Sequence, residues 1–235
     1  MEEFLTRTQN LIGEKAVQKL QNSTVLVFGL GGVGSYTVEA LARAGINHLV
    51  LVDGDVIAKS NINRQLFATV NTVNKPKTEA AVQRINSINP HCEIETYSKF
   101  ITADNIDEIC FSGVDYVVDA IDTVSTKLEI VKKAQSLNIP IISSMGTGNK
   151  LNANIFKIED IKNTKVCPLC KVMRKLCKEN NIESLKVLYS EEEPIKQNNL
   201  IKESEKLTPA SISYVPAVAG LLIAGEVIKD LVKGC

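Results

Sequence analysis

A glycine-rich run at positions 29–34 is the part of the chain best suited to bind a phosphate group. It reads Gly-Leu-Gly-Gly-Val-Gly, follows an apolar run at 24–28 and opens a helical pattern. Glycine permits a tight turn and a close backbone approach, and the free N–H groups at the start of a helix favour negative charge. Asp53 ends the next apolar run, where a carboxylate can reach a ribose hydroxyl. The loop predicts a bound nucleotide through Gly29, Gly31, Gly32 and Gly34.

The glycine loop alone does not separate NAD from ATP, nor a bound nucleotide from a tight turn in an empty Rossmann-like fold. The polar residues that follow Asp53 favour a triphosphate; they are Asp55, Asn61, Arg64, Gln65 and Lys77. A dehydrogenase does not need them, because the glycine loop already holds its pyrophosphate. Charge that moves onto a leaving pyrophosphate is stabilised by fixed cations, so we expect Arg64 and Lys77 to hold phosphates. The alternative is an exposed loop arginine and a lysine in the first turn of a solvated helix.

Two further carboxylates, Asp119 and Asp122, stand at the end of a later apolar run. The carboxyl ends of parallel strands are where α/β proteins bind their ligands. Asp122 suits Mg²⁺, which favours one or two carboxylates together with phosphate oxygens. Asp119 is either a second ligand of the cofactor or a cap for the helix that begins near Thr123.

The elements that must position these residues alternate between strand and helix. Short apolar runs predict strands at 24–28, 49–53, 114–119 and 139–143, with a weaker one at 94–97. Helical spacing occupies 7–20, 33–44, 77–88 and 123–137. The alternation predicts a Rossmann-like α/β fold with a mostly parallel sheet and flanking helices.

After residue 148 the alternation fails. Short strands are expected at 153–158, 186–189 and 211–215 as an antiparallel extension, a packed helix follows from 215, and the polar residues 191–207 are expected to form a mobile loop. We expect one adenylation domain over 1–235, made of an N-terminal helix at 1–22, a nucleotide-binding core at 23–148 and a substrate-side extension at 149–235.

Composition limits the function classes. The 235 residues are 44% hydrophobic, and 27 basic residues balance 27 acidic ones, so no net field draws the whole surface to nucleic acid. The acidic N-terminus lacks a secretory pattern, no apolar stretch is long enough for a membrane span, and six cysteines are too few for a disulfide framework. We expect a cytoplasmic enzyme, with His48 and His91 as ordinary surface residues beside strands.

Together these motifs resemble the ubiquitin-activating-type superfamily, whose bacterial members include MoeB and ThiF. The resemblance rests on the glycine loop, 53–55, 63–65, Lys77 and 119–122, within residues 7–148. It implies that a carboxylate attacks the α-phosphate of ATP, with Mg²⁺ bound, to give an acyl-adenylate and pyrophosphate. It also implies a homodimer with shared sites, in which Arg7 reaches into the partner's site. The implied catalytic residues are Arg7, Arg64, Lys77 and Asp122; the implied nucleotide ligands are the four glycines, Asp53, Asp55, Asn61, Arg64, Gln65, Lys77, Asp119 and Asp122.

Motifs in the second half resemble one branch, the tRNA threonylcarbamoyladenosine dehydratases (TcdA). They lie at 145–151, 167–175, 187–194 and 211–216, and they extend the resemblance nearly end to end. The branch implies that tRNA carrying threonylcarbamoyladenosine at position 37 is the substrate, and that its adenylated carboxylate closes into a ring. The alternative is MoeB/ThiF-like adenylation of the C-terminus of a ubiquitin-like sulfur-carrier protein. An NAD-dependent oxidoreductase leaves Arg64 and Lys77 unexplained, and a non-catalytic scaffold would not need them.

The cysteines and a basic helix bear on the partners. MoeB and ThiF relatives commonly hold zinc with two C-x-x-C pairs, whereas here only Cys167 and Cys170 form a pair, with Cys177 and Cys235 remaining. A zinc site, a redox disulfide, packed thiols and a sulfur-transfer partner all stay open. The helical pattern that carries Lys171, Arg174, Lys175 and Lys178 favours a local contact with tRNA phosphates, and a solvated face is the alternative.

Overall fold

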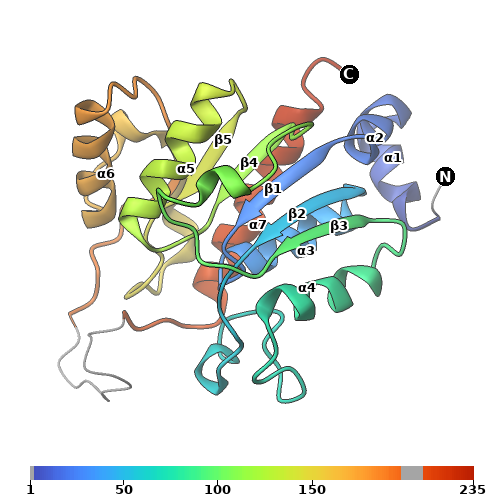
Figure 1. The fold of residues 1–235 in the computed structure, drawn as a ribbon, viewed down its shortest axis with the longest axis horizontal. Helices are drawn as coiled ribbons and strands as arrows, with labels where there is room; N and C mark the ends of the chain where they lie inside the picture. The colour runs from blue at the N-terminus through green and yellow to red at the C-terminus, as the bar shows by residue number, and fades with distance from the viewer. Residues whose placement is uncertain (1–2, 197–208) are drawn as a thin grey trace.

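A seven-stranded sheet forms the centre of the computed structural model, which describes residues 3–196 and 209–235. The strand order is β3-β2-β1-β4-β5-β7-β6. Every neighbouring pair is parallel except β6 with β7, which close one edge as an antiparallel pair (Figure 1). The strands are β1 Thr24–Phe28, β2 His48–Val52, β3 Glu93–Tyr97, β4 Tyr116–Asp119, β5 Ile141–Ser144, β6 Phe156–Asp160 and β7 Lys186–Ser190. The predicted Rossmann-like fold with an antiparallel extension is confirmed.

Helices cover both faces of the sheet (Figure 1). The α-helices are α1 Thr6–Ile12, α2 Glu14–Gln21, α3 Gly34–Arg43, α4 Lys77–Asn86, α5 Val124–Ser136, α6 Pro168–Glu179 and α7 Tyr214–Leu231. Single 3-10 turns are η1 Glu3–Leu5, η2 Lys59–Asn61, η3 Ile106–Glu108, η4 Ala153–Ile155 and η5 Ile161–Asn163. The helices predicted at 33–44, 77–88 and 123–137 are confirmed to within two residues at each end.

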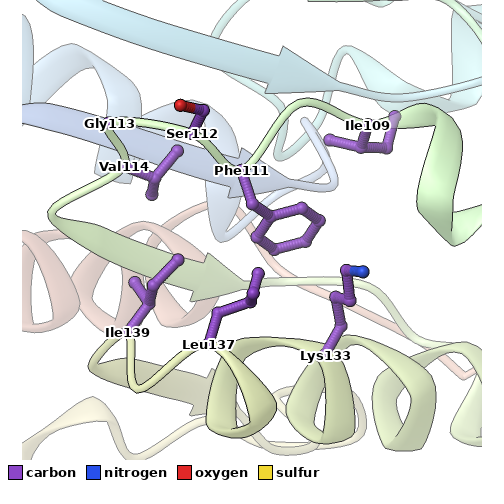
Figure 2. Close-up of a pocket in the computed structure, with 8 residues that line it drawn as sticks. All are labelled: Ile109, Phe111, Ser112, Gly113, Val114, Lys133, Leu137 and Ile139. Atoms are coloured by element: carbon purple, nitrogen blue, oxygen red, sulfur yellow. The ribbon is translucent and has the colours of Figure 1, made fainter.

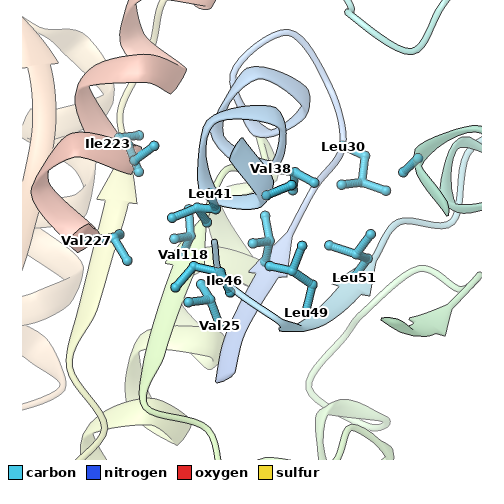
Figure 3. Packing of buried hydrophobic residues seen from close by; sticks show 14 of the residues in the cluster. Val25, Leu30, Val38, Leu41, Ile46, Leu49, Leu51, Val118, Ile223 and Val227 are labelled. Carbon is cyan, nitrogen blue, oxygen red and sulfur yellow. The ribbon is translucent and has the colours of Figure 1, made fainter. Parts of the chain in front are cut away.

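Two apolar cores lie on the two faces of the sheet because side chains alternate along each strand. In β1, Val25 and Val27 join the core beneath α3, α4 and α7, while Leu26 and Phe28 join the core beneath α5 and α6. Figure 3 shows the first core, in which Ile223 of α7 and Leu41 of α3 lie close to the strands. The continuous apolar runs of the sequence therefore correspond to strands buried on both faces.

The structure corrects two predicted elements. The helix expected at 7–20 is two helices, because Gly13 adopts φ +87° and ψ 162° and ends α1. Such a conformation is open to glycine and closed to most L-residues. The strand expected at 211–215 is also wrong, since Tyr214 begins α7. The mixed apolar and polar residues at 211–215 do not by themselves distinguish a short strand from the approach to a helix, and the apolar positions that continue to Leu231 belong to the helix.

The polar segment predicted as a mobile loop falls mostly outside the described residues. Only positions 191–196 belong to the described part, and they form no helix or strand. Within the ranges 3–196 and 209–235, no helix has the length and apolar character that crossing a bilayer requires.

Candidate nucleotide-binding and active site

The glycine loop follows β1 at the point where the strand order reverses between β1 and β4. Gly29 has φ +88°, and a Cβ on it would lie 2.7 Å from the carbonyl oxygen of Ala120, just after β4. A Cβ on Gly34 would lie 1.8 Å from the carbonyl oxygen of Gly29. These two glycines close the turn on itself and against the end of β4. Ligands of α/β proteins bind at such a reversal of strand order.

The two middle glycines face different neighbours. A Cβ on Gly32 would lie 3.0 Å from the Cβ of Pro216 in α7, so this glycine lets α7 approach the loop. A Cβ on Gly31 would meet only the Nε2 atom of Gln65, 4.0 Å away. The space beside Gly31 is therefore open, which is the feature expected where a phosphate group approaches the backbone.

Asp53 ties the glycine loop to the residues after β2. Its Oδ2 atom accepts the backbone N–H of Leu30 at 2.6 Å, and its Oδ1 atom accepts that of Asp55 at 2.8 Å. The Nζ atom of Lys77 lies 2.6 Å from Oδ2 of Asp55 and 3.4 Å from Oδ2 of Asp53. Lys77 is 5% exposed, so it is a buried cation between two carboxylates and not a solvated lysine in a first helical turn. A phosphate oxygen can replace one of those carboxylates as its partner.

The turn at residues 61–65 lies against the same loop. The Nη1 atom of Arg64 donates to the carbonyl oxygen of Ser60 at 3.0 Å and to Oδ1 of Asn63 at 2.9 Å. The carbonyl oxygen of Asn61 accepts the N–H groups of Arg64 and Gln65, which makes the turn compact. The Arg64 guanidinium is half-buried and contacts no carboxylate among the described residues. It keeps donors for a further anion.

Asp119 and Asp122 have opposite surroundings. Asp119 is fully buried, and its oxygens accept hydrogen bonds from Nζ of Lys127 at 2.9 Å, Oγ of Ser143 at 2.7 Å and the N–H of Ile121 at 3.2 Å. Asp122 is exposed, and among the described residues its carboxylate accepts one long bond of 3.4 Å from a hydroxyl. No side chain caps α5, so Asp119 is not the helix cap either. Of the two carboxylates, Asp122 is the one open to a ligand, and Asp119 lies behind it.

The C-terminal third borders this site through Asn149, a residue that was not predicted. Its N–H donates to the carbonyl oxygen of Ala210 at 2.7 Å, and its Oδ1 atom accepts the N–H of Ala210 at 2.8 Å. Its carbonyl oxygen accepts the N–H of Ile195 at 2.8 Å. Nearby, Nδ2 of Asn63 donates to the carbonyl oxygen of Ser211 at 3.1 Å, which links this segment to the Arg64 turn. The only sequence signal for Asn149 is its turn-like setting after two glycines; its φ of +58° is one that asparagine tolerates.

Arg7 lies away from the other predicted site residues of its own chain. It belongs to α1, which follows Leu5, and Leu5 packs against Gly45 just before the start of β2. That position is the amino edge of the sheet, whereas the glycine loop lies at the carboxyl edge (Figure 1). Arg7 is exposed and has no hydrogen bond or ion pair with a described residue. The structure therefore does not bring Arg7 together with the other predicted site residues of its own chain.

The C-x-x-C pair begins α6. Cys167, Cys170 and Cys177 are buried, and Cys235 is exposed. The Cys170 thiol and backbone N–H groups at the start of α6 outweigh burial and lower the pKa of Cys167 to about 5, and the same contact raises the pKa of Cys170. In the two described ranges, no group of three or more His, Cys, Asp or Glu side chains is placed to hold a metal ion. Cys167, Cys170 and Cys177 belong to the apolar core beneath α5 and α6.

A hollow of about 480 Å³ lies elsewhere, beneath the segments that lead into β4 and β5 (Figure 2). Phe111, Val114, Leu137 and Ile139 supply most of its apolar wall. Its cation, Lys133, is paired with Asp107 at 2.6 Å. The hollow is at the edge of the sheet opposite the glycine loop and contains no group suited to nucleotide chemistry.

Comparison with known proteins gives a consistent set of relatives. The ThiF family model matches residues 5–234. A tRNA threonylcarbamoyladenosine dehydratase of Bacillus subtilis is 40% identical, over 97% of this chain and 94% of that protein. The crystal structure of E. coli tRNA N6-threonylcarbamoyladenosine dehydratase in complex with ATP superposes with a TM-score of 0.90 and 28% identity, over 98% of this chain and 94% of that one. The crystal structure of the same enzyme in complex with AMP superposes with a TM-score of 0.88.

A relative that acts in sulfur transfer matches over a shorter stretch. The adenylyltransferase and sulfurtransferase UBA4 of Vanderwaltozyma polyspora is 38% identical over 65% of this chain, and the match spans 34% of that protein. The likeness covers less of both chains than the dehydratase matches do.

Proposed function

The chain belongs to the ThiF family and to its tRNA threonylcarbamoyladenosine dehydratase branch, and we propose that it is an ATP-dependent enzyme that adenylates the carboxylate of threonylcarbamoyladenosine in tRNA. The carboxylate attacks the α-phosphorus of ATP, and pyrophosphate leaves. A nitrogen or oxygen atom of the same modified nucleoside then attacks the acyl-adenylate, AMP leaves, and a ring closes with net loss of water.

The observation that carries this proposal is the buried cation beside the open glycine loop. The Nζ atom of Lys77 lies 2.6 Å from Oδ2 of Asp55 and 3.4 Å from Oδ2 of Asp53, and the same Oδ2 atom of Asp53 accepts the N–H of Leu30 in the loop. A fixed ammonium at the edge of a phosphate cradle stabilises charge on the β- and γ-phosphates without reorganisation at the moment of reaction. Arg64, on the neighbouring turn, supplies the second cation. A dehydrogenase would have no use for this pair.

The donor set also fits Mg²⁺ bound together with ATP. Asp122 is an exposed carboxylate at the carboxyl edge of the sheet, beside the turn at Ala120 that contacts Gly29. Mg²⁺ is usually held by one or two carboxylates, phosphate oxygens and waters, so a single free carboxylate suffices. When bound, the ion supplies positive charge to the phosphate oxygens. The part of Asp122 is to orient it.

Arg7 leads us to propose a homodimer with shared sites. Because Arg7 lies at the amino edge of its own sheet, the arginine that completes a site must come from a second subunit. Arg7→Ala and Arg64→Ala homodimers should both be inactive. Mixing them under subunit exchange should restore activity, because a mixed dimer has one site that lacks neither arginine. No recovery after exchange, with mixed dimers verified by mass, would refute the shared site.

We propose that tRNA docks on the outer face of α6, in the cytoplasm. Lys171, Lys175 and Lys178 are exposed on this helix, while Arg174 donates to the carbonyl oxygen of Thr164 at 2.9 Å and helps to hold the helix in place. Lysines that contact phosphates release counterions, so each lost contact lowers the salt dependence of binding by about one unit of slope. Lys171→Ala with Lys175→Ala should weaken tRNA binding and flatten its salt dependence. The matched control is Lys132→Ala on α5, which pairs with Glu129.

Pyrophosphate release tests the reaction and its substrate together. Purified protein with ATP and Mg²⁺ should release pyrophosphate when given tRNA that carries threonylcarbamoyladenosine, and the nucleoside should lose the mass of one water. The same tRNA without the modification is the control. Release with a ubiquitin-like carrier protein instead would favour the sulfur-transfer alternative, and release with neither would sink the adenylation proposal.

A further inference from the structure

A buried ion pair lies directly behind the end of β4. Lys127 of α5 and Asp119 of β4 are both fully buried, and Nζ of Lys127 lies 2.9 Å from Oδ2 of Asp119. The same ammonium donates to the carbonyl oxygen of Ile121 at 2.8 Å. Asp119 in turn accepts the N–H of Ile121 at 3.2 Å. Both polar groups of the Ile121 backbone are thus held by this one pair.

The turn that the pair holds is the one that carries the site. Ala120 donates its N–H to the carbonyl oxygen of Phe28 at 2.8 Å, and its own carbonyl oxygen is the atom that a Cβ on Gly29 would strike. Asp122 follows directly, and within the described part of the chain its carboxylate has one hydrogen-bond partner, the Thr123 hydroxyl at 3.4 Å. The direction of the Asp122 carboxylate therefore depends on how firmly the main chain at Ile121 is fixed.

We propose that Lys127 is a positioning residue for the adenylation site. It neutralises Asp119 and fixes the carbonyl oxygen of Ile121, and so it aims Asp122 at the phosphates and supports the glycine loop through Ala120. This inference rests on the proposed function. It adds a role that neither the motif spacing nor exposure predicts, since a lysine within a helix usually faces solvent.

A single substitution cannot separate positioning from folding, because Lys127→Met leaves Asp119 buried without a counter-charge. The pair Asp119→Asn with Lys127→Met removes both charges together and keeps the volumes similar. It should recover most of the thermal stability that Lys127→Met loses. It cannot recover the bond to Ile121, because methionine has no donor. Lys133→Met, which removes an exposed ion pair from the same helix, is the matched control.

We expect the double variant to fold and to bind ATP with a Kd within about threefold of wild type, since the backbone cradle of the glycine loop remains. Its kcat should fall by about 100-fold, the scale of a 1 Å misplacement of a reacting group. It should also need more Mg²⁺ for half-maximal rate, because Asp122 is no longer aimed. A double variant with full kcat and an unchanged Mg²⁺ requirement would overturn the proposal, because Lys127 would then serve only to balance a charge.

Hydrogen exchange keeps the inference testable apart from the reaction. In the folded double variant, peptides that cover residues 119–123 should exchange at least about tenfold faster than in wild type, while β1 keeps its protection. If wild type releases no pyrophosphate, the proposed function fails, yet this exchange result still reports on the turn. Unchanged exchange at 119–123 would overturn the positioning role whatever the activity.

Discussion

Two glycines within α7 offer a matched test of how this helix supports the glycine loop. A Cβ on Gly220 would lie 2.3 Å from the carbonyl oxygen of Val33, 2.9 Å from Cβ of Tyr36 and 3.0 Å from the N atom of Thr37. A Cβ on Gly225 would meet no atom within 4 Å. Both positions lie inside the helix, so replacement by alanine brings the same gain in helix propensity, about 0.5–1 kcal/mol.

The difference between the two variants therefore isolates the steric cost. Overpacking of a core contact costs about 1–3 kcal/mol, and backbone atoms cannot move aside as a flexible side chain can. For a chain of this size, 1 kcal/mol corresponds to about 2–4 °C in Tm. Gly225→Ala should melt slightly above wild type, and Gly220→Ala should melt about 2–12 °C below Gly225→Ala.

The same contact predicts an effect on nucleotide binding. Val33 is part of the glycine loop, so a displaced carbonyl at Val33 shifts the N–H groups that face the phosphates. Saturating ATP should raise the Tm of Gly225→Ala as much as that of wild type, but it should raise the Tm of Gly220→Ala less. Calorimetry with and without ATP measures both quantities. Equal Tm values for the two variants, or an equal rise with ATP, would refute the claim that α7 packs tightly against the loop.

Three further outcomes follow from the site and its supports. Asp122→Asn should retain ATP binding in equilibrium dialysis while pyrophosphate release falls steeply, since its charge acts mainly on the transition state; loss of ATP binding instead would contradict that role. Asn149→Ala should raise the KM for tRNA more than the KM for ATP, because it removes the Oδ1 atom that accepts the N–H of Ala210 beside the site, and equal changes in both would count against it. Burial raises the pKa of Asp230, but the hydrogen bonds that Lys186 and Tyr116 donate to its carboxylate lower it by more, so the pKa lies below its usual 3.8. The ionised Asp230 carboxylate therefore stabilises the fold fully above about pH 4, and this stabilisation is lost as pH falls through the folded pKa. Asp230→Asn should lower the Tm at pH 7 and flatten the fall of Tm below about pH 4. Parallel Tm–pH curves for the variant and wild type would contradict this.

Much of the fold could be predicted because the buried strands of a parallel sheet are continuous apolar runs in the sequence. The run at 24–28 is apolar at each position but the first, as required of β1, which is buried on both faces. The glycine loop could be located because its spacing reflects close approaches that exclude a side chain at Gly29 and Gly34. The candidate phosphate-binding loop at 29–34 is thus encoded locally, in residues that are neighbours along the chain.

The remaining features depend on contacts that are distant in sequence. Lys127 could not be told from an exposed helical lysine, because only the tertiary fold places Asp119 beside it. Asn149 acts through backbone groups of residues 46 and 61 positions away, which no spacing rule detects. The strand expected at 211–215 was wrong because the five residues there are too few to distinguish a short strand from the segment that leads into α7.

The packing of α7 against the glycine loop also orders events during synthesis. The segment Tyr214–Leu231 is made long after β1 and the glycine loop, yet Ala219, Ile223 and Val227 belong to the core that also contains β1, and Pro216 contacts Gly32. Chains emerge from the ribosome at about 5–20 residues per second, and units fold as they become complete. The first 148 residues of a nascent chain therefore contain the whole phosphate loop but lack the helix that supports it. ATP should bind firmly only after α7 has emerged and packed, so a ribosome stalled before residue 214 would carry a chain without nucleotide.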